Sequence, residues 1–302
     1  MAARGSNSYV STINEATYGE TPGTPEMTIV PVITNNINLT KALFDDPTIY
    51  PDSQFRNVRH GNKGVAGDVS VVYTVNNYDT WLESLMQNDW ATDVLKFGEV
   101  KKSFTIERGF EDINQYAKYT GTVVDTFELE VTTDGVVRST FSFVGQDMSI
   151  DGTSLDSTPV EASDEDPFVH LDGTFLIADA VANDCTLLGV AFSIEKNLDQ
   201  IYCLGNDAIK EPTVGMIEVT GTITAFFEDE VMLTKFIDEE DSKLKFTLTD
   251  PTGAFHEYYL PQIVYTTANI DQADAGIIPI EMEFQAVYNT TEGTTMSITR
   301  SA

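Results

Sequence analysis

The sequence predicts an all-β protein made of two similar domains. Three observations predict this: apolar residues alternate with polar ones along most of the chain, helical patterns are scarce, and one order of motifs occurs twice. Alternation places apolar side chains on one face of a strand and polar side chains on the other. At 302 residues the chain could form two domains of about 150 residues, each able to bury its own core.

Three stretches of the sequence predict strands most clearly. The clearest alternation lies in residues 68–73, 122–131 and 280–288. In the second stretch, Phe127 and Leu129 would face a core while Glu128 and Glu130 would face outwards. The dipeptide Asp134-Gly135 follows this stretch and precedes another apolar run, which predicts a β-hairpin.

Two helices are predicted, at residues 78–88 and 230–239. In the first, Trp81, Leu82, Leu85 and Met86 fall at helical spacing. Thr80 and Glu83 have the spacing of a capping box at the start of that helix.

The same order of motifs runs through both halves of the chain. Residues 37–41 resemble 192–196, 67–73 resemble 221–227, 104–106 resemble 246–248, Tyr116 matches Tyr258, and 139–143 resemble 280–284. Each glycine-containing strand leads into a helix candidate, which two unrelated β domains would not share. We infer a duplication.

Composition sets the predicted boundaries. Residues 1–30 are rich in Gly, Ser, Thr and Pro and are predicted to be an arm that stays disordered or orders on a neighbour. Residues 31–150 are the first β domain, 151–167 an acidic linker without a period, and 168–302 the second β domain. Each domain also has a long irregular segment, residues 42–64 and 197–214, and loops of this length are usually functional.

Charge excludes some functions. The chain has 48 acidic and 17 basic residues, a formal net charge of −31. Such a surface repels phosphates and has few cations to displace their counterions, which argues against specific binding of nucleic acid. A solubility surface, a cation-binding surface, or a surface that DNA passes without adhering remains open. No apolar run is long enough for a membrane span, and the N-terminus lacks a signal-peptide pattern.

No residue pattern indicates catalysis, a metal or a cofactor. His60, His170 and His256 lie far apart, and none has a partner at metal-ligand spacing. The cysteines, Cys185 and Cys203, also lack such spacing and are expected to be buried or half-buried thiols, their redox state left open. We therefore predict a protein that is not an enzyme.

Several segments resemble the major tail tube protein of long-tailed bacteriophages. They are residues 15–25 (EATYGETPGTP), 102–116 (KSFTIERGFEDINQY), 119–127 (YTGTVVDTF) and 140–145 (TFSFVG). The resemblance implies two tail-tube-like β-sandwich or barrel domains, each flanked by one short helix. It also implies a virion tail protein, assembled in the cytoplasm of the bacterial host, whose rings stack into a hollow tube for genomic DNA.

In such rings one sheet of each domain contributes to an inner wall. The candidate lumen-facing residues lie on the polar faces of the predicted strands: Asp68, Ser70, Glu128, Glu130, Thr220, Thr222, Thr224, Glu281 and Glu283. An acidic wall would repel phosphates at close range and keep DNA from adhering in transit. Some of these side chains could instead face solvent outside the tube.

Partners follow from the resemblance and the duplication. Rings in this family have six domains, so a chain with two domains predicts a homotrimeric, pseudo-hexameric ring, with a homohexamer as the alternative. The arm and the long loop would contact the next ring. A tape measure protein and a tail terminator are implied as further partners, DNA as a non-specific passenger, and no membrane.

Two other classes of function stay open. One is a different tail protein, such as a terminator, tail-tip or decoration protein. The other is an acidic all-β carbohydrate-active module, since paired carboxylates could serve a glycosidase. With 48 acidic residues, however, chance pairs are expected and carry little diagnostic weight.

Overall fold

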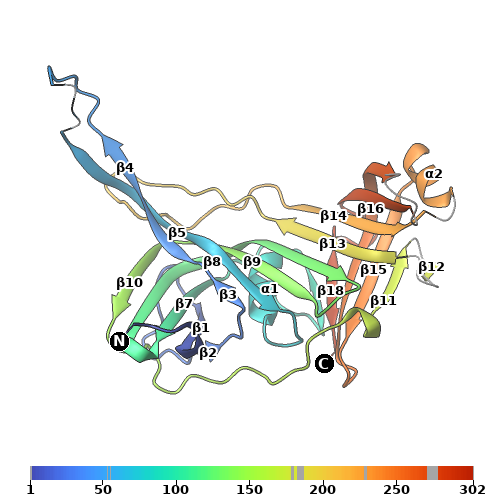
Figure 1. Cartoon of the computed structure of the whole chain (residues 1–302), viewed down its shortest axis with the longest axis horizontal. Coiled ribbons are helices and arrows are strands. Elements are labelled where there is room, and N and C mark those ends of the chain that lie inside the picture. The colour runs from blue at the N-terminus through green and yellow to red at the C-terminus, as the bar shows by residue number, and fades with distance from the viewer. Residues whose placement is uncertain are drawn as a thin grey trace.

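The computed structural model describes residues 2–52, 54, 56–177, 180–181, 187–227, 230–270 and 278–301. Within these ranges the chain consists mainly of antiparallel strands, with two α-helices, α1 (Asp79–Met86) and α2 (Val231–Ile237). Both helices lie where the sequence predicts them, and the all-β prediction is confirmed. The two halves of the chain lie at opposite ends of the molecule (Figure 1).

Each half has the same series of strands around its helix. In the first half the strands are β4 (Asn38–Asp45), β5 (Val58–Val72), β7 (Ser103–Phe110), β8 (Gln115–Thr132) and β9 (Arg138–Gly145). In the second half they are β13 (Leu187–Glu195), β14 (Glu218–Phe226), β15 (Ser242–Thr249), β16 (Phe255–Ile270) and β17 (Pro279–Ala286). The pairing order β4–β5–β9–β8–β7 corresponds strand for strand to β13–β14–β17–β16–β15.

The register of the two halves also agrees. Gly67 lies opposite Phe143, and Gly221 lies opposite Phe284. The ladder from β8 to β9 skips Asp125, and the ladder from β16 to β17 skips Thr266 at the equivalent place. A bulge is a specific local feature, so its occurrence at matching positions supports a duplication.

Two of the sequence matches are wrong in register. Phe104 pairs with Thr122, and the equivalent pair in the second half is Ser242 with Ile263. The counterpart of Phe104 is therefore Ser242 and not Phe246. Likewise Tyr258 lies opposite Phe246, so its counterpart is Ala117, opposite Arg108, and not Tyr116. Between these equivalent pairs the β15–β16 hairpin is three residues longer than the β7–β8 hairpin, so no single offset aligns both strands.

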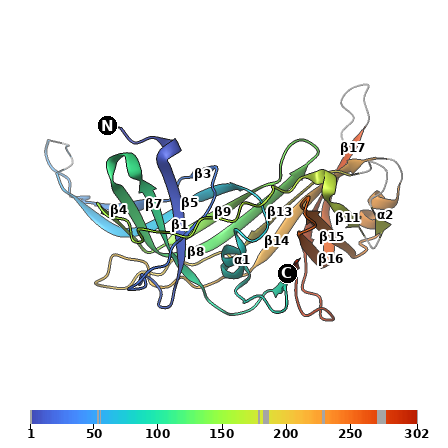
Figure 2. The same cartoon turned by 90° about the horizontal axis from the view of Figure 1, so that it is seen from below.

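β8 and β13 pair with each other and join the halves into one sheet. Residues 126–132 of β8 lie antiparallel to residues 189–195 of β13. The strand order β4–β5–β9–β8–β13–β14–β17–β16 is thus continuous across both halves. Figure 2 shows the β4–β5 end of this arrangement and the α2 end far apart.

Short strands form a second layer behind this sheet, because β8 and β16 are long enough to pair in both layers. In the first half this layer contains β7, β10 (Asp147–Asp151), β1 (Ser8–Glu15) and β2 (Thr28–Ile29). In the second half it contains β15, β11 (Thr174–Ile177), β12 (Ala180–Val181) and β18 (Ser297–Arg300). β18 also pairs with β6 (Val94–Lys96) from the first half, so the second layer ties the halves together.

Other short elements complete the fold. β3 (Thr34–Asn35) pairs with β5, and single 3₁₀ turns lie at Gly5–Asn7, Glu111–Ile113 and His170–Asp172. The predicted hairpin turn lies between β8 and β9, where Gly135 has a φ of 92°. A glycine is suited to this turn because L side chains rarely adopt a positive φ.

α1 packs its apolar face into the core. Trp81, Leu82, Leu85 and Met86 are all buried, as the helical spacing predicts. The predicted capping box is absent, because Tyr78 takes the N-cap position without a side-chain cap. The Glu83 carboxylate instead accepts a hydrogen bond of 2.6 Å from Lys102 Nζ.

The N-terminal segment differs from the predicted arm. β1 pairs with β7 along its whole length, and Val10, Met27 and Val30 are buried. The alternation in residues 8–15 is short and mixed with hydroxyl side chains, so its apolar face is hard to recognise in the sequence. These residues belong to the core of the first half.

The two long segments differ from each other. Residues 42–45 and 58–64 of the first segment lie in strands, because β4 and β5 form a hairpin that projects from the molecule (Figure 1). Residues 197–214 remain irregular and lie back against the first half, where Lys63 N–H donates to Asp207 O at 2.7 Å. Residues 152–167 form no helix or strand and cross the first half, with Val160 N–H donating to Met27 O at 2.8 Å.

Deleting residues 2–16 removes β1 and exposes the edge of β7. We expect a loss of roughly 10 °C in thermal midpoint, because a buried ladder and the Val10 contact are lost. Deleting only residues 2–7, which precede β1, is the matched control and should leave the midpoint nearly unchanged. Equal midpoints for both deletions, measured by circular dichroism, would show that β1 is dispensable.

Candidate functional site: an acidic face and two open sheet edges

The residues predicted to line a lumen share one face of the continuous sheet. Ser70 lies opposite Thr140 with their hydroxyls 3.3 Å apart, and Asp68 accepts a 2.7 Å hydrogen bond from Ser142 Oγ. The side chains between these positions, such as Val69 and Val71, are buried on the other face. The same alternation holds on β8, β14 and β17, where the neighbours of the candidates are buried: Phe127, Leu129, Val219, Ile223, Ile280, Met282 and Phe284.

Polar side chains form rows that cross the junction between the halves. One row joins directly opposed residues from β5 to β17: Ser70, Thr140, Glu128, Ser193, Thr220 and Gln285. The next row runs through Arg138, Glu130, Ala191, Thr222, Glu283 and Thr267. Thr224 lies opposite Glu281 in a further row. The face is therefore one surface and not two separate patches.

This face is hollowed. A depression of about 800 Å³ extends from β5 to β16 and includes six of the predicted residues: Ser70, Glu128, Glu130, Thr220, Thr222 and Glu283. Asp68, Thr224 and Glu281 share the face but lie outside the depression. The floor of the depression spans β8 and β13, so its shape depends on their pairing.

Some members of this face are not among the residues predicted from the sequence. Glu195 and Glu218 lie opposite each other on β13 and β14, and both are exposed. Arg138 adds a positive charge opposite Glu130. All three continue the period-two alternation of their strands, which could have identified them. Glu195 and Glu218, together with the predicted carboxylates, make the face strongly acidic despite Arg138.

The continuous sheet ends in two open edges. β4 pairs only with β5 along residues 38–45, and residues 264–270 of β16 pair only with β17, within the part of the chain that the structure describes. Open edges carry unpaired N–H and C=O groups and are usually protected unless they pair with another chain. The two edges lie at opposite ends of the molecule and could be joined only between different copies.

The β4–β5 hairpin carries exposed apolar side chains. Leu43 and Phe44 on β4 and Val58 on β5 are each more than half exposed, and Ile49 at the tip is 95% exposed. A concentration of exposed apolar groups on one projecting element is typical of a protein contact surface.

The comparisons with known proteins decide the family. A family model described as phage tail tube protein matches residues 5–286. The chain belongs to the phage tail tube protein family. A search of curated proteins finds no match. The family makes this a structural component of the virion tail, implies a non-enzymatic protein, and suggests self-assembly and association with other tail proteins.

The remaining sequence predictions concern metals, thiols and membranes. Cys203 is an exposed free thiol, not a buried one, and Cys185 lies outside the described residues. Among the residues that the structure describes, no cluster of His, Cys, Asp and Glu could hold a metal ion. Within the same residues, no helix combines the length and the apolar character needed to span a membrane.

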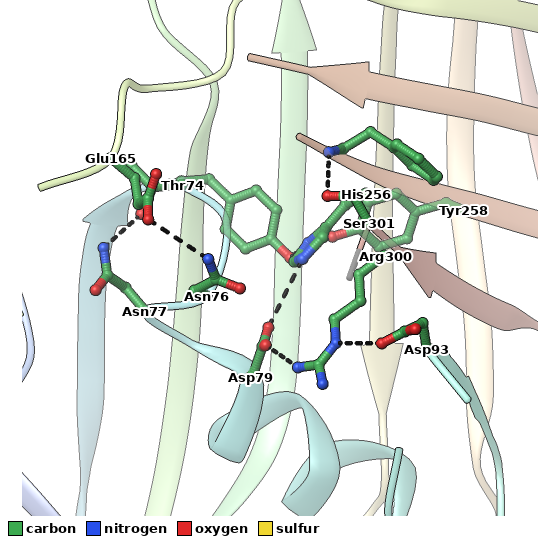
Figure 3. Close-up of polar contacts among 12 residues, drawn as sticks. Thr74, Asn76, Asn77, Asp79, Asp93, Glu165, His256, Tyr258, Arg300 and Ser301 are labelled. Carbon is green, nitrogen blue, oxygen red and sulfur yellow. Dashed lines mark hydrogen bonds and ion pairs between the residues drawn. The ribbon is translucent and has the colours of Figure 1, made fainter. Parts of the chain in front are cut away.

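A buried polar cluster joins the two halves behind the sheet (Figure 3). Asp79, at the start of α1, forms an ion pair with Arg300 on β18, and Arg300 Nε lies 3.4 Å from Asp93 Oδ1. Arg300 also stacks over Trp90, with its guanidinium carbon 4.4 Å from the ring centre. The cluster thus connects α1 and its following loop to the last strand of the chain.

His256 completes this cluster as a neutral side chain. Tyr258 OH donates to Tyr73 OH, and Tyr73 OH lies 2.9 Å from His256 Nδ1. Burial lowers the pKa of His256 to about 3, and the Arg300 charge acts in the same direction. Burial raises the pKa of Asp79, although Arg300 opposes this shift. The neutral imidazole can accept at Nδ1, which fixes its tautomer with Nε2–H towards Asp79, 3.7 Å away.

The His256→Gln variant should alter how stability depends on pH. The folded pKa is about 3 and the ordinary value is 6.5, so as pH falls the unfolded chain takes up the proton first. The stability contributed by neutral His256 is complete above pH 6.5 and is lost towards pH 3. The wild-type advantage over His256→Gln should shrink in that window by up to about 1.4 kcal/mol per pH unit.

Urea midpoints measured from pH 7 to pH 4 provide the test. Tyr258→Phe is the matched control, because it removes the neighbouring hydrogen bond but no group that titrates in this range. Its difference from wild type should stay constant with pH. A constant difference for His256→Gln as well would show that folding does not lower the pKa of His256.

Proposed function

We propose that three copies of this chain close into a pseudo-hexameric ring, and that such rings stack into the tube that conducts phage DNA. The observation that carries the proposal is the pairing of β8 with β13 inside one chain. β16 is the counterpart of β8, β4 is the counterpart of β13, and both have an open edge. The pairing within the chain is thus a template for pairing between chains.

The template specifies a register. Because Glu128 lies opposite Ser193, their counterparts Asn269 and Asn38 should lie opposite each other between neighbouring chains. In the same register Leu39 meets Ala268, and Thr40 meets Thr267. Apolar side chains then meet apolar ones on the core side, and polar side chains meet polar ones on the acidic face. A shift of one residue would mix the two faces.

Three chains follow from counting junctions. If every junction has the geometry of β8 with β13, each half of a chain occupies one of six equivalent positions. Each half then turns the ring by one of these six positions. A heterologous interface of this geometry therefore closes after three chains. We keep residues 31–150 and 168–302 as the proposed domains, with residues 8–30 joined to the first and 151–167 linking them. A homohexamer is the alternative that the next experiment separates.

The acidic face is proposed as the lumen wall. Asp68, Glu128, Glu130, Glu281 and Glu283 would place negative charge opposite the DNA phosphates within about one Debye length, roughly 8 Å in physiological salt. Arg138 is held opposite Glu130, which limits its capacity to bind a phosphate. The wall would therefore displace few counterions from the DNA and let the genome slide.

Stacking is assigned to the exposed hairpin. The apolar side chains of Leu43, Phe44 and Ile49 would be buried against the adjacent ring. A tape measure protein inside the tube and a tail terminator at its end are the further proposed partners. Assembly would take place in the cytoplasm of the bacterial host.

Cysteine cross-linking tests the ring and its stoichiometry. Asn38→Cys and Asn269→Cys are combined in a chain whose native thiols are changed by Cys185→Ser and Cys203→Ser. Opposed residues of antiparallel strands have Cα atoms about 4.5–5.5 Å apart, which permits a disulfide. We expect a ladder of oxidised species on non-reducing gels that ends at the trimer.

The control for this experiment pairs Asn38→Cys with Ala268→Cys, whose side chains would point to opposite faces. It should give little cross-linking. A ladder that ends at six chains supports the hexamer, whereas a ladder without an end indicates an open filament. Absence of any cross-link would overturn the proposed junction.

Charge reversal tests the lumen wall. Rings that carry Glu128→Lys, Glu130→Lys and Glu283→Lys should retain a short DNA duplex, and retention should weaken steeply with salt. The control carries Glu161→Lys, Asp164→Lys and Asp166→Lys, the same change in charge in the 152–167 segment. Fluorescence anisotropy of labelled duplex measures binding. Equal retention by both variants would place the acidic face outside the lumen.

A further inference from the structure

The buried Lys196 marks the junction between the two halves. It follows β13 directly, its side chain is completely buried, and its Nζ donates to the carbonyl oxygen of Ser84 at 3.0 Å. Ser84 lies in the last turn of α1. Carbonyls in the last turn of a helix lack an intrahelical partner and form the negative end of the helix dipole, so a lysine satisfies them.

The backbone of Lys196 also belongs to the junction. Its N–H donates to Asp125 O at 3.0 Å, which extends the ladder of β13 with β8 by one residue. Burial lowers the pKa of Lys196 to about 7, and the Asp125 charge opposes this shift. The lysine side chain therefore reaches from one half of the chain into a polar contact with the helix of the other.

Lys41 is the counterpart of Lys196 in the first half. Phe192 lies opposite Gly221, and Ile37 lies against Gly67 in the same way. Lys41 and Lys196 each come four residues later. The two lysines thus occupy one position of the duplicated fold, but only Lys196 has another half beside it.

In the single chain Lys41 has no anionic partner among the residues that the structure describes. Its side chain is exposed and lies opposite Lys63, which is itself paired with Asp147 at 2.8 Å. Like charges directly opposite each other on neighbouring strands are unfavourable. Within the part of the chain that the structure describes, Lys41 forms no ion pair. An anionic partner from outside the chain would complete this position.

The matching receptor is the C-terminal end of α2. α2 packs on β16 as α1 packs on β8. The helix ends at Ile237 and is followed by four exposed or partly exposed acidic residues, Asp238, Glu239, Glu240 and Asp241. Thr266 stands where the first half has Asp125, and backbone N–H groups already donate to the carbonyls of Thr234, Lys235 and Phe236, so the four carboxylates would supply most of the negative charge.

We propose that Lys41 is an intersubunit latch: when β4 pairs with β16 of a neighbouring copy, the Lys41 ammonium inserts at the C-terminal end of that copy's α2. The inference rests on the proposed ring and adds a residue-level contact to it. The partner is a second copy of this chain. The contact joins a cation at one end of the molecule to an acidic helix end at the other, so it favours head-to-tail association.

Amine labelling of disulfide-locked rings tests the latch. The rings carry Asn38→Cys and Asn269→Cys in the background without native thiols. They are treated briefly with acetic anhydride, and acetylation of each lysine is measured by mass spectrometry. The exposed Lys210 is the internal reference, and the chain unfolded in guanidinium gives the intrinsic rates. We expect the rate for Lys41 relative to Lys210 to fall at least about tenfold in the rings, as burial protects an amine.

The labelling results distinguish a failure of the Lys41 contact from a failure of the proposed ring. Protection of both Lys41 and Lys196 supports the proposal. Locked rings in which Lys41 reacts as fast as Lys210 would overturn the latch and leave the ring intact. If the double-cysteine chain gives no closed ring at all, the proposed function fails and the latch with it.

Charge variants give an independent readout. Lys41→Glu should raise the protein concentration needed for half-maximal trimer cross-linking about tenfold, because it places a carboxylate against the acidic helix end. Lys41→Arg should assemble like the unchanged chain. Lys210→Glu is the matched control and should have no effect. Normal assembly of Lys41→Glu would contradict the latch.

Discussion

The pairing of β8 with β13 is the interaction on which the rest of the structure depends. This ladder joins the sheet of the first half to the sheet of the second half and makes one continuous surface. It aligns the polar rows, shapes the depression across them, and leaves β4 and β16 as the ends of the sheet. Because strand faces alternate with period two, the register of one ladder decides which side chains line the whole face.

Buried polar groups fix the angle between the halves. Asp79 and Arg300 come from distant parts of the chain and neutralise each other's charge, while His256 is held beside them by its hydrogen bond to Tyr73. Ion pairs of this kind add little net stability compared with apolar packing, but removing one partner is costly. The pairing of β18 with β6 acts at the same place. The second layer therefore ties the two halves together behind the continuous sheet.

The sequence predicts the parts of this fold that depend on local pattern. Period-two alternation is a local property, so the strands, both helices, the Gly135 turn and the shared face of Glu128 and Thr220 could be inferred. Hairpin lengths and long-range contacts do not follow from this pattern. The longer hairpin of β15 and β16 displaced the match of Phe104, and nothing near Asp79 in the sequence indicates Arg300 as its partner. β1 was missed because its stability comes from β7, about a hundred residues away.

The halves are alike in their sheets but not in their loops. The first half has the projecting β4–β5 hairpin, whereas residues 197–214 of the second half fold back on the chain (Figure 1). In the proposed ring of three chains the inner wall would repeat six times, but the hairpins would repeat only three times. One ring could then dock on the next in three equivalent orientations instead of six. The inner wall and the contacts that set the rotation of one ring on the next would then lie in different parts of one duplicated chain. Each could therefore change in evolution without the other.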